Sequence, residues 1–324
     1  MTIARSQNSG KLGHVGPFAF IAAIACLALI PWFTGSTFHF HIAIMVCLGA
    51  MAAAGLGTIA WVGQLSLAHG AFVGIGAYTC VLLVTRLGVP FILGLPAAAL
   101  VAGAIAYIIG TPLLRLRGVY FVLITFALNE LFRLVMLEFP SVSGGSSGIA
   151  GVSKISIFGF ELQRQQDVYV FTLLMLALVI LALWTIRKGP LGRRFAAVEE
   201  NLDLAEASGI PTARTQNIAF VLGSAIAGFT GAIMAHYIGF ISPETFGFQL
   251  SVSYVILLVC GGRLSLAGPI VGAVFLTPLP EFLRSAHEYQ HIIYGVVLIV
   301  VLRFIPDGLS ALPRKLLSYR GERS

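Results

Sequence analysis

Long apolar runs, separated by short polar segments, recur along the whole chain. A helix needs roughly 20 residues to cross about 30 Å of hydrocarbon, and most of the runs approach this length. The pattern predicts an all-α, polytopic integral membrane protein with about ten transmembrane helices. We expect them at residues 17–35, 40–61, 70–87, 90–112, 118–138, 168–186, 216–239, 249–261, 266–283 and 289–305.

Two of these runs are weaker than the others, which leaves a second topology open. The run 249–261 is short, and the run 70–87 follows a polar, glycine-rich stretch. Eight full spans with re-entrant segments would therefore also fit. The first run follows Arg5 and Lys11, as a signal peptide would. No small-residue cleavage site comes after it, so we expect a retained helix.

The composition supports a membrane protein and makes several other classes poor fits. Of the 324 residues, 58% are hydrophobic and 10% are charged, whereas a soluble domain carries about 25% charged residues. The mean hydropathy of +0.94 agrees. A soluble enzyme, a disordered chain and a nucleic-acid-binding protein all fit poorly. The net charge of +7 lies in clusters between apolar runs, as cytoplasmic loops require, so no nucleic-acid partner is expected.

Basic residues predict the orientation of the spans. With the N-terminus in the cytoplasm, only Arg86, Lys154, Arg164 and Arg284 fall in external loops. This asymmetry favours cytoplasmic N- and C-termini. The cytoplasmic side then holds Arg115, Arg117, Arg187, Lys188, Arg193, Arg194, Arg214, Arg263, Arg303, Arg314, Lys315, Arg320 and Arg323.

The same count divides the chain into a membrane domain and two tails. Residues 1–16 form an N-terminal cytoplasmic tail, and residues 306–324 form a basic C-terminal one. Between them, residues 17–305 form the transmembrane domain. It includes an external loop at 139–167 and a cytoplasmic loop at 187–216. Glycines flanked by Ala and Ser predict close helix packing, namely Gly55, Gly57, Gly70, Gly74, Gly76, Gly223, Gly228 and Gly231.

Polar residues inside or between apolar runs are candidates for a translocation path. These candidates are Gln64, Ser66, His69, Asn129, Glu130 and Arg133. For Gln64, Ser66 and His69, a cytoplasmic turn with interhelical hydrogen bonds is an equal alternative. Glu130 and Arg133 are three positions apart on one helical face, so a self-neutralising pair is the favoured alternative there.

Other polar groupings are less specific. The string Gly63–Ala68 resembles Gly262–Ala267, since both read Gly-x-Leu-Ser-Leu-Ala, which suggests a weak repeat. Backbone N–H groups of an external Gly/Ser loop could form an anion nest, although a flexible loop is the simpler interpretation. That loop contains Gly144, Gly145, Ser146 and Gly148. We expect no metal site, because neither His39 with His41 nor His287 with His291 has a completing carboxylate or cysteine nearby in sequence.

The loop from Arg187 to Asn217 is the most informative segment. Gly and Pro stand at both ends, helix-forming residues fill the interior, and apolar positions follow helical spacing. It predicts a short amphipathic helical unit that docks on another protein. The candidate docking residues are Gly192, Arg193, Arg194, Phe195, Glu199, Ala205, Glu206 and Gly209. No Gly-x-x-x-x-Gly-Lys-Ser/Thr string occurs, so energy from ATP would come from a partner.

Several motifs together resemble the LivM-type permeases of branched-chain amino-acid ABC transporters. They cover roughly residues 55–280, in the order found in that family. Two departures are Gln216, where a basic residue is usual, and the order Ala68-His69-Gly70. The motifs are Gly63–Phe72, Gly76–Thr79, Leu116–Phe121, Gly144–Ile149, Gly192–Ile210, Ala219–Val221, Ala227–Ala232, Gly261–Gly262 and Gly268–Pro269.

The resemblance implies a transport subunit rather than an enzyme, in the bacterial inner membrane. It implies a second, homologous permease, two cytoplasmic ATPase subunits and an external substrate-binding protein as partners. It also implies that Arg193–Ile210 couples to an ATPase, and that ATP and Mg are bound there, with no cofactor in this chain. The substrate would be a branched-chain or related amino acid, with urea or short amides as the alternative. A cation-coupled carrier using Glu130, a passive channel and a membrane-embedded enzyme are the rival classes.

Overall fold

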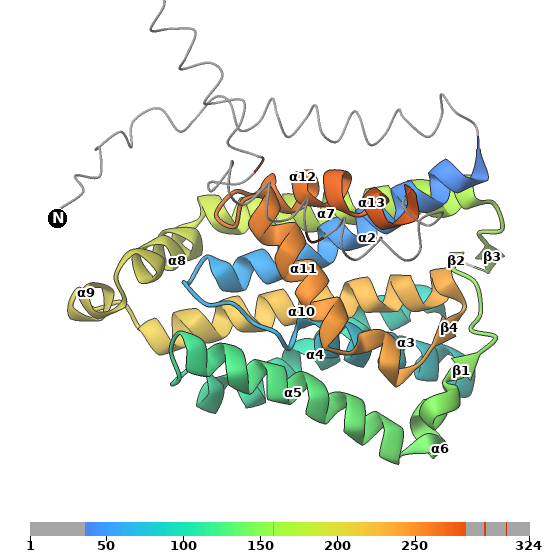
Figure 1. Cartoon of the computed structure of the whole chain (residues 1–324), viewed down its shortest axis with the longest axis horizontal. Coiled ribbons are helices and arrows are strands. Elements are labelled where there is room, and N and C mark those ends of the chain that lie inside the picture. The colour runs from blue at the N-terminus through green and yellow to red at the C-terminus, as the bar shows by residue number, and fades with distance from the viewer. Residues whose placement is uncertain (1–35, 158, 283–294, 296–308, 310–324) are drawn as a thin grey trace, which may run out of the picture.

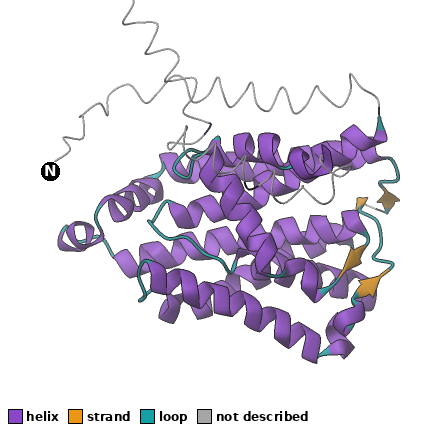
Figure 2. Cartoon of the chain, viewed as in Figure 1, coloured by secondary structure: helices purple, strands orange, loops and turns teal. Residues whose placement is uncertain are grey.

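The computed structural model describes residues 36–157 and 159–282, together with the single positions Gly295 and Leu309. This part of the chain is almost entirely helical (Figure 2). Its principal helices are α2 (Thr37–Ala60), α3 (His69–Leu87), α4 (Phe91–Leu113), α5 (Val119–Glu138), α7 (Gln165–Lys188), α8 (Pro190–Glu200), α9 (Leu202–Ala207), α10 (Thr212–Ile238), α11 (Phe248–Gly261) and α12 (Gly268–Leu276).

Shorter elements complete the described part. The helix α6 (Pro140–Ser143) follows α5, and α13 (Pro278–Phe282) follows α12. Two-residue strands form two antiparallel pairs. The strands and 3-10 turns are η1 (Gly145–Ser147), β1 (Ile149–Ala150), β2 (Ser156–Ile157), β3 (Phe160–Glu161), β4 (Phe240–Ile241) and η2 (Pro243–Phe246).

Seven helical segments are long and apolar enough to cross a membrane. They correspond to seven of the predicted spans, including 70–87 and 249–261, which the sequence left in doubt. Pro243–Gly261 reaches 19 residues because η2 precedes α11. The predicted span 266–283 is found as α12 and α13, and the described apolar segment Gly268–Pro280 is shorter than a full span. The predicted spans 17–35 and 289–305 lie outside the described residues.

Helix α2 lies at the centre of the bundle, and α5 lies at its edge. In the most apolar window of α2, 89% of residues are buried, against 17% for α5. Small residues permit this packing, as the sequence predicted. A Cβ on Gly76 of α3 would lie 2.0 Å from the carbonyl oxygen of Gly228 on α10. Only glycine permits that approach of two helix backbones.

The helices run roughly side by side, so their connections gather at two opposite ends (Figure 1). At one end, which we call the α8–α9 end, Arg117 pairs with Asp203. At the other, the strand end, β1 pairs with β4. The described basic residues near the α8–α9 end are Arg115, Arg117, Arg187, Lys188, Arg193, Arg194, Arg214 and Arg263. Those near the strand end are Arg86, Lys154 and Arg164. The predicted charge asymmetry is thus present in space.

Candidate functional site

The turn from α7 into α8 is fixed by two local features. Pro190 occupies the first turn of α8, where its missing N–H leaves no hydrogen bond unmade. Two residues later, a Cβ on Gly192 would lie 2.0 Å from the carbonyl oxygen of Arg187. No side chain fits in that space, so the first turn of α8 lies directly against the last turn of α7. Gly192 therefore sets the direction in which α8 leaves the bundle.

The loop predicted as one helical unit contains two helices, which corrects that detail of the prediction. Asn201 has an extended backbone (φ −157°, ψ 109°), and its side chain accepts a hydrogen bond from Leu204 N–H at 3.0 Å. It therefore ends α8 and caps the N-terminus of α9. Gly209 ends α9 at φ +80°, with Ile210 N–H donating to Ala205 C=O at 3.0 Å, the pattern of a Schellman motif.

The amphipathic division predicted for this loop is present across both helices. Phe195, Val198 and Ala205 are buried. The outer side consists mainly of charged residues with one large apolar side chain, Leu204, which is 65% exposed. The exposed charged residues are Arg193, Arg194, Glu200, Asp203 and Glu206. We call the exposed face of residues 193–206 the α8–α9 surface; Figure 1 shows these helices extending beyond the other helices.

Glu199 lies where α8 meets the loops that precede α3 and α12. Its carboxylate pairs with Arg263, with the nitrogen and oxygen 3.3 Å apart. Its Cα lies 4.0 Å from the position a Cβ would take on Gly63. Arg187, at the end of α7, donates to Leu264 C=O and lies over the Trp61 ring at 5.0 Å. The C-terminal ends of α7 and α8 are therefore held against these loops.

These two loops are the related strings noted in the sequence, and they share two structural features. Each begins at a glycine with positive φ, +78° at Gly63 and +117° at Gly262. Each ends where a helix begins, α3 at His69 and α12 at Gly268. The backbones differ beyond these two features, because Ser265 N–H donates to Gly262 C=O within the second loop, whereas Gln64 N–H donates back to Ile59 C=O in α2. Movement of α8 would reach the first turns of two separate membrane helices.

The N-terminus of α3 is capped by side chains from other helices. Its preceding residue is Ala68, which has no side-chain hydrogen-bond acceptor. Instead, Gly70 N–H donates to Ser251 Oγ at 2.8 Å, and Ala71 N–H donates to Asn129 Oδ1 at 2.8 Å. These bonds satisfy N–H groups that a helix leaves free at its start.

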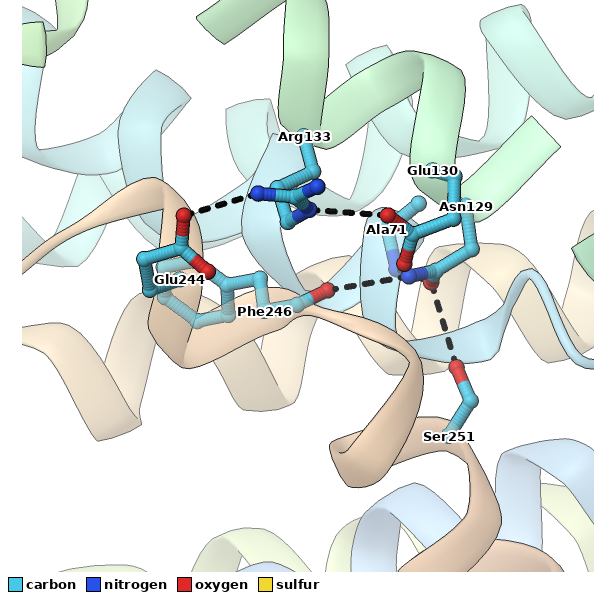
Figure 3. Close-up of polar contacts among 7 residues, drawn as sticks. All are labelled: Ala71, Asn129, Glu130, Arg133, Glu244, Phe246 and Ser251. Carbon is cyan, nitrogen blue, oxygen red and sulfur yellow. Dashed lines mark hydrogen bonds and ion pairs between the residues drawn. The ribbon is translucent and has the colours of Figure 1, made fainter. Parts of the chain in front are cut away.

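The two capping side chains also bind each other, so three elements meet at one point (Figure 3). Ser251 Oγ donates to Asn129 Oδ1 at 3.1 Å, and Asn129 Nδ2 donates to Phe246 C=O at 3.3 Å. Both side chains are fully buried. A Cβ on Gly70 would lie 2.8 Å from Ser251 Oγ. The network therefore ties α3, α5 and the η2–α11 segment together.

The remaining loop candidates are buried rather than exposed to a described cavity. Ser66 Oγ accepts a hydrogen bond from Ala68 N–H at 3.2 Å. His69 Nε2 lies 2.8 Å from Ala52 C=O on α2. Gln64 is 6% exposed. In this conformation Ser66, His69 and Asn129 make interhelical or turn contacts, which is the alternative that the sequence left open for Gln64, Ser66 and His69.

Glu130 and Arg133 form the ion pair that the sequence suggested, and a third residue joins them. Arg133 Nε lies 2.8 Å from Glu130 Oε2, and its Nη1 lies 2.8 Å from Glu244 Oε1 (Figure 3). Sequence reasoning missed Glu244. In the sequence, Glu244 stands out only as a single carboxylate after α10, and nothing nearby indicates Arg133 as its partner. The two side chains on α5 are each about a quarter exposed, at 28% and 25%, so the group lies at the surface of the bundle.

The Gly/Ser loop that the sequence predicts to be external is folded against the strand end. Gly144, Gly145 and Gly148 have positive φ. Their N–H groups donate within the loop, to Pro140 C=O, Ser143 Oγ and Gly145 C=O. The pairing of β1 with β4 follows directly. These glycines, with Ser146 in η1, therefore act as turn positions, and the three N–H groups are occupied in this conformation.

Among the described residues, no group of three or more His, Cys, Asp or Glu side chains is placed to hold a metal. His41 Nδ1 instead lies 2.6 Å from the Tyr237 hydroxyl. Cys47, Cys80 and Cys260 are buried free thiols. The pair His287 and His291, and Cys26, lie outside the described residues.

The comparison with known families decides the class. A family described as the permease component of the branched-chain amino acid transport system matches residues 15–302. The chain belongs to this family. The residues that form the α8–α9 surface, the Glu199 contacts and the Asn129 network all fall inside the matched range. They are thus features of a permease component.

Individual relatives support the assignment. The chain is 32% identical over 319 residues to the high-affinity branched-chain amino acid transport system permease protein LivM of Salmonella typhimurium, which covers 91% of this chain and 75% of that protein. LivM of Escherichia coli is 31% identical over the same shares. LivH of Escherichia coli is 33% identical over 46% of this chain and 48% of its own length.

A more distant relative has a different substrate in its name. The autoinducer 2 import system permease protein LsrC of Photorhabdus laumondii is 34% identical over 42% of this chain and 42% of its own length. Sequence similarity within this group of permeases therefore extends across chemically different cargo. No solved structure matches the chain.

Proposed function

We propose that the chain is the membrane permease subunit of an ATP-driven importer for branched-chain or related amino acids, in the bacterial inner membrane. The α8–α9 surface contacts a separate cytoplasmic ATPase, which binds the ATP and Mg. The contacts of Glu199 carry this proposal. They join the exposed helices to the loops that precede α3 and α12, so a displacement imposed from outside the chain has a direct route into the bundle.

The charge distribution supports the orientation that this function needs. Eight described basic residues lie near the α8–α9 end and three near the strand end, as named above. Because cytoplasmic loops carry an excess of Lys and Arg, the α8–α9 end faces the cytoplasm. The strand end then faces outward, where an external substrate-binding protein delivers its cargo. The folded Gly/Ser loop, held by the β1–β4 pair, is part of that outer surface.

A second, homologous permease covers the outer side of α5. Large apolar side chains there are more than half exposed: Val119, Tyr120, Leu123, Leu131 and Leu134. The same helix carries Glu130 and Arg133, and charged groups facing hydrocarbon are costly. Glu130, Arg133 and Glu244 together carry a net negative charge. We therefore place the translocation path between α5 and the second subunit, with these three residues beside it.

Reversing charge on the α8–α9 surface tests the proposal. We expect Glu200→Arg with Glu206→Arg to leave the protein in the membrane but to lower ATPase association and leucine uptake at least tenfold. The matched control is Glu161→Arg with Asp167→Arg, which reverses two exposed carboxylates near the strand end. It should keep ATPase association. Wild-type uptake in the α8–α9 variant would refute the proposal.

Competition between unlabelled compounds and labelled leucine tests which class of substrate the transporter binds. Branched-chain amino acids should displace labelled leucine from the intact transporter, and urea or acetamide should not. Displacement by urea or acetamide alone would move the chain to the alternative substrate class, within the same importer mechanism.

A further inference from the structure

A groove of about 780 Å³ runs along the surface near the α8–α9 end. Its walls are the last two turns of α4, the first half of α10 and one side of α9. None of the candidate translocation residues lines it. The ligand of the groove therefore has to be inferred from the residues that line it.

Along both long walls, the lining residues change from charged to apolar with distance from the α8–α9 end. On α10, Arg214 is followed on one helical face by Asn217, Ile218 and Val221, which all line the groove. On the other wall, Arg115 follows the end of α4, and Thr111 and Tyr107 come before it. Eight positions separate Arg115 from Tyr107, or roughly 12 Å along a helix. The groove thus has a basic end and an apolar end.

The basic end holds charge that the protein does not neutralise. Three arginines line it, against one carboxylate, Glu206, among the described residues. Arg117 pairs with Asp203 at 3.2 Å. Arg115 and Arg214 form no ion pair with any residue that the structure describes. Two guanidinium groups therefore remain available to an anion.

The middle of the groove offers an unused polar side chain. Gln216 is 5% exposed and lines the groove, yet no hydrogen bond joins its amide to another described residue. The amide is therefore free to bond a molecule that enters the groove. The next residue on α10, Asn217, donates from Nδ2 to Thr111 Oγ1 on α4 at 3.2 Å. A ligand with acceptor oxygens just below its anionic group would satisfy Gln216.

The apolar end lies at the outer surface of the bundle. Tyr107 is 63% exposed, and its neighbour Ile108 on the same helix is 71% exposed. In a chain that spans a membrane, this side of α4 meets lipid. A soluble anion would use only the arginines, whereas a molecule with an anionic head, ester oxygens and a hydrocarbon tail would use the whole groove.

We propose that this groove binds an anionic phospholipid of the cytoplasmic leaflet. Its phosphate lies between Arg115 and Arg214, its ester region meets Gln216, and one acyl chain follows Tyr107, Ile218 and Val221. This placement rests on the orientation given under the proposed function. Because Leu202 and Glu206 of α9 border the same groove, the bound lipid also holds α9 in position.

The lipid that stays bound to the purified protein tests the proposed phospholipid site directly. The full-length chain is reconstituted in bilayers of mixed phosphatidylglycerol and phosphatidylcholine, extracted, and examined by native mass spectrometry. The wild type should retain phosphatidylglycerol in preference to phosphatidylcholine. Arg115→Gln with Arg214→Gln should lower that retention about thirtyfold, because each basic residue contributes roughly 1 kcal/mol to binding an anionic lipid.

Three controls make the result decisive. Lys154→Gln with Arg164→Gln removes two positive charges near the strand end and should change nothing. Arg115→Lys with Arg214→Lys keeps the charge and should retain most of the lipid. Each single Gln variant should lose about fivefold, which answers the question if the double variant fails to fold.

Four outcomes would overturn the proposal. They are equal retention by the wild type and the Gln variants, no preference for the anionic lipid, and displacement of the lipid by millimolar inorganic phosphate, which would indicate a soluble anion. The fourth is loss of ATPase association in the Gln variants with unchanged lipid retention, which would assign the groove to a protein partner.

Discussion

Glu199 on α8 pairs with Arg263 in the loop before α12, at 3.3 Å. The two residues are 64 positions apart in sequence. The pair joins a helix outside the bundle to a loop that begins a membrane helix. Gly63, in the loop before α3, lies beside the same residue. Glu199 is thus the contact through which the exposed helices meet both loops.

Removing this ion pair should affect transport more than stability. Arg263 is 50% exposed and Glu199 is 24% exposed, and exposed pairs contribute about 0.2–1 kcal/mol. We expect Arg263→Gln to change the unfolding free energy by less than about 1 kcal/mol, while leucine uptake per ATP hydrolysed falls severalfold. The exchange Glu199→Arg with Arg263→Glu should recover part of the loss. No recovery would show that the two residues act independently.

Gly192 should tolerate no side chain. A Cβ there would lie 2.0 Å from the Arg187 carbonyl oxygen, so Gly192→Ala should move α8 away from α7. We expect loss of ATPase co-purification with the chain still in the membrane. The control is Gly88→Asn, at a left-handed position with φ +63° and open space, which Asn can adopt. Normal ATPase binding by Gly192→Ala would contradict the proposed geometry.

Two serines on α11 give a matched test of the Asn129 network. Ser251 is fully buried and bonds both Gly70 and Asn129, whereas among the described residues Ser253 bonds only Gln249, on its own helix. Ser251→Ala should lower the unfolding free energy by about 1–3 kcal/mol, because it leaves buried groups without partners. Ser253→Ala should change it by about 0.5 kcal/mol or less. Thermal unfolding of the purified chain in detergent distinguishes them, and equal effects would remove the network's structural role.

Substitutions in the Glu130–Arg133–Glu244 group test whether the protein is part of an ATP-driven importer or is a cation-coupled carrier. Glu130→Gln leaves Arg133 paired with Glu244, so we expect reduced but ATP-dependent uptake that is insensitive to a protonophore at constant ATP. Arg133→Gln should lower uptake further than Glu130→Gln does, because it leaves two carboxylates without their cation. Uptake that persists without ATP and stops in Glu130→Gln would favour the carrier.

Apolar run length was enough to predict the helices, because a span's length follows from the thickness of hydrocarbon. Seven predicted spans are helices within a few residues of their expected bounds. The division of the loop at Asn201 was missed, since a single Asn fits either a helix surface or a cap. The short bounds of α12 follow from Pro278, which begins a new helix and cannot donate to the preceding turn.

The partners of polar residues were harder to predict than the residues themselves. Asn129, Glu130 and Glu199 were chosen from the sequence, but Ser251, Glu244 and Arg263 were not identified as their partners. Each partner comes from a distant segment, and the distances involved depend on how α5, α8 and α11 pack. Only Arg133, three positions from Glu130 on one helix, could be paired from spacing alone.

Site-specific photo-crosslinking from Leu204 tests the central claim most directly. Leu204 is 65% exposed on α9, and Phe160, near the strand end, is 80% exposed. A photoreactive residue at each position is compared in membranes that contain the complete transporter. The account predicts an adduct with the ATPase subunit from position 204, with a yield that changes when nucleotide binds, and no such adduct from position 160. An ATPase adduct from position 160, or none from position 204, would contradict it.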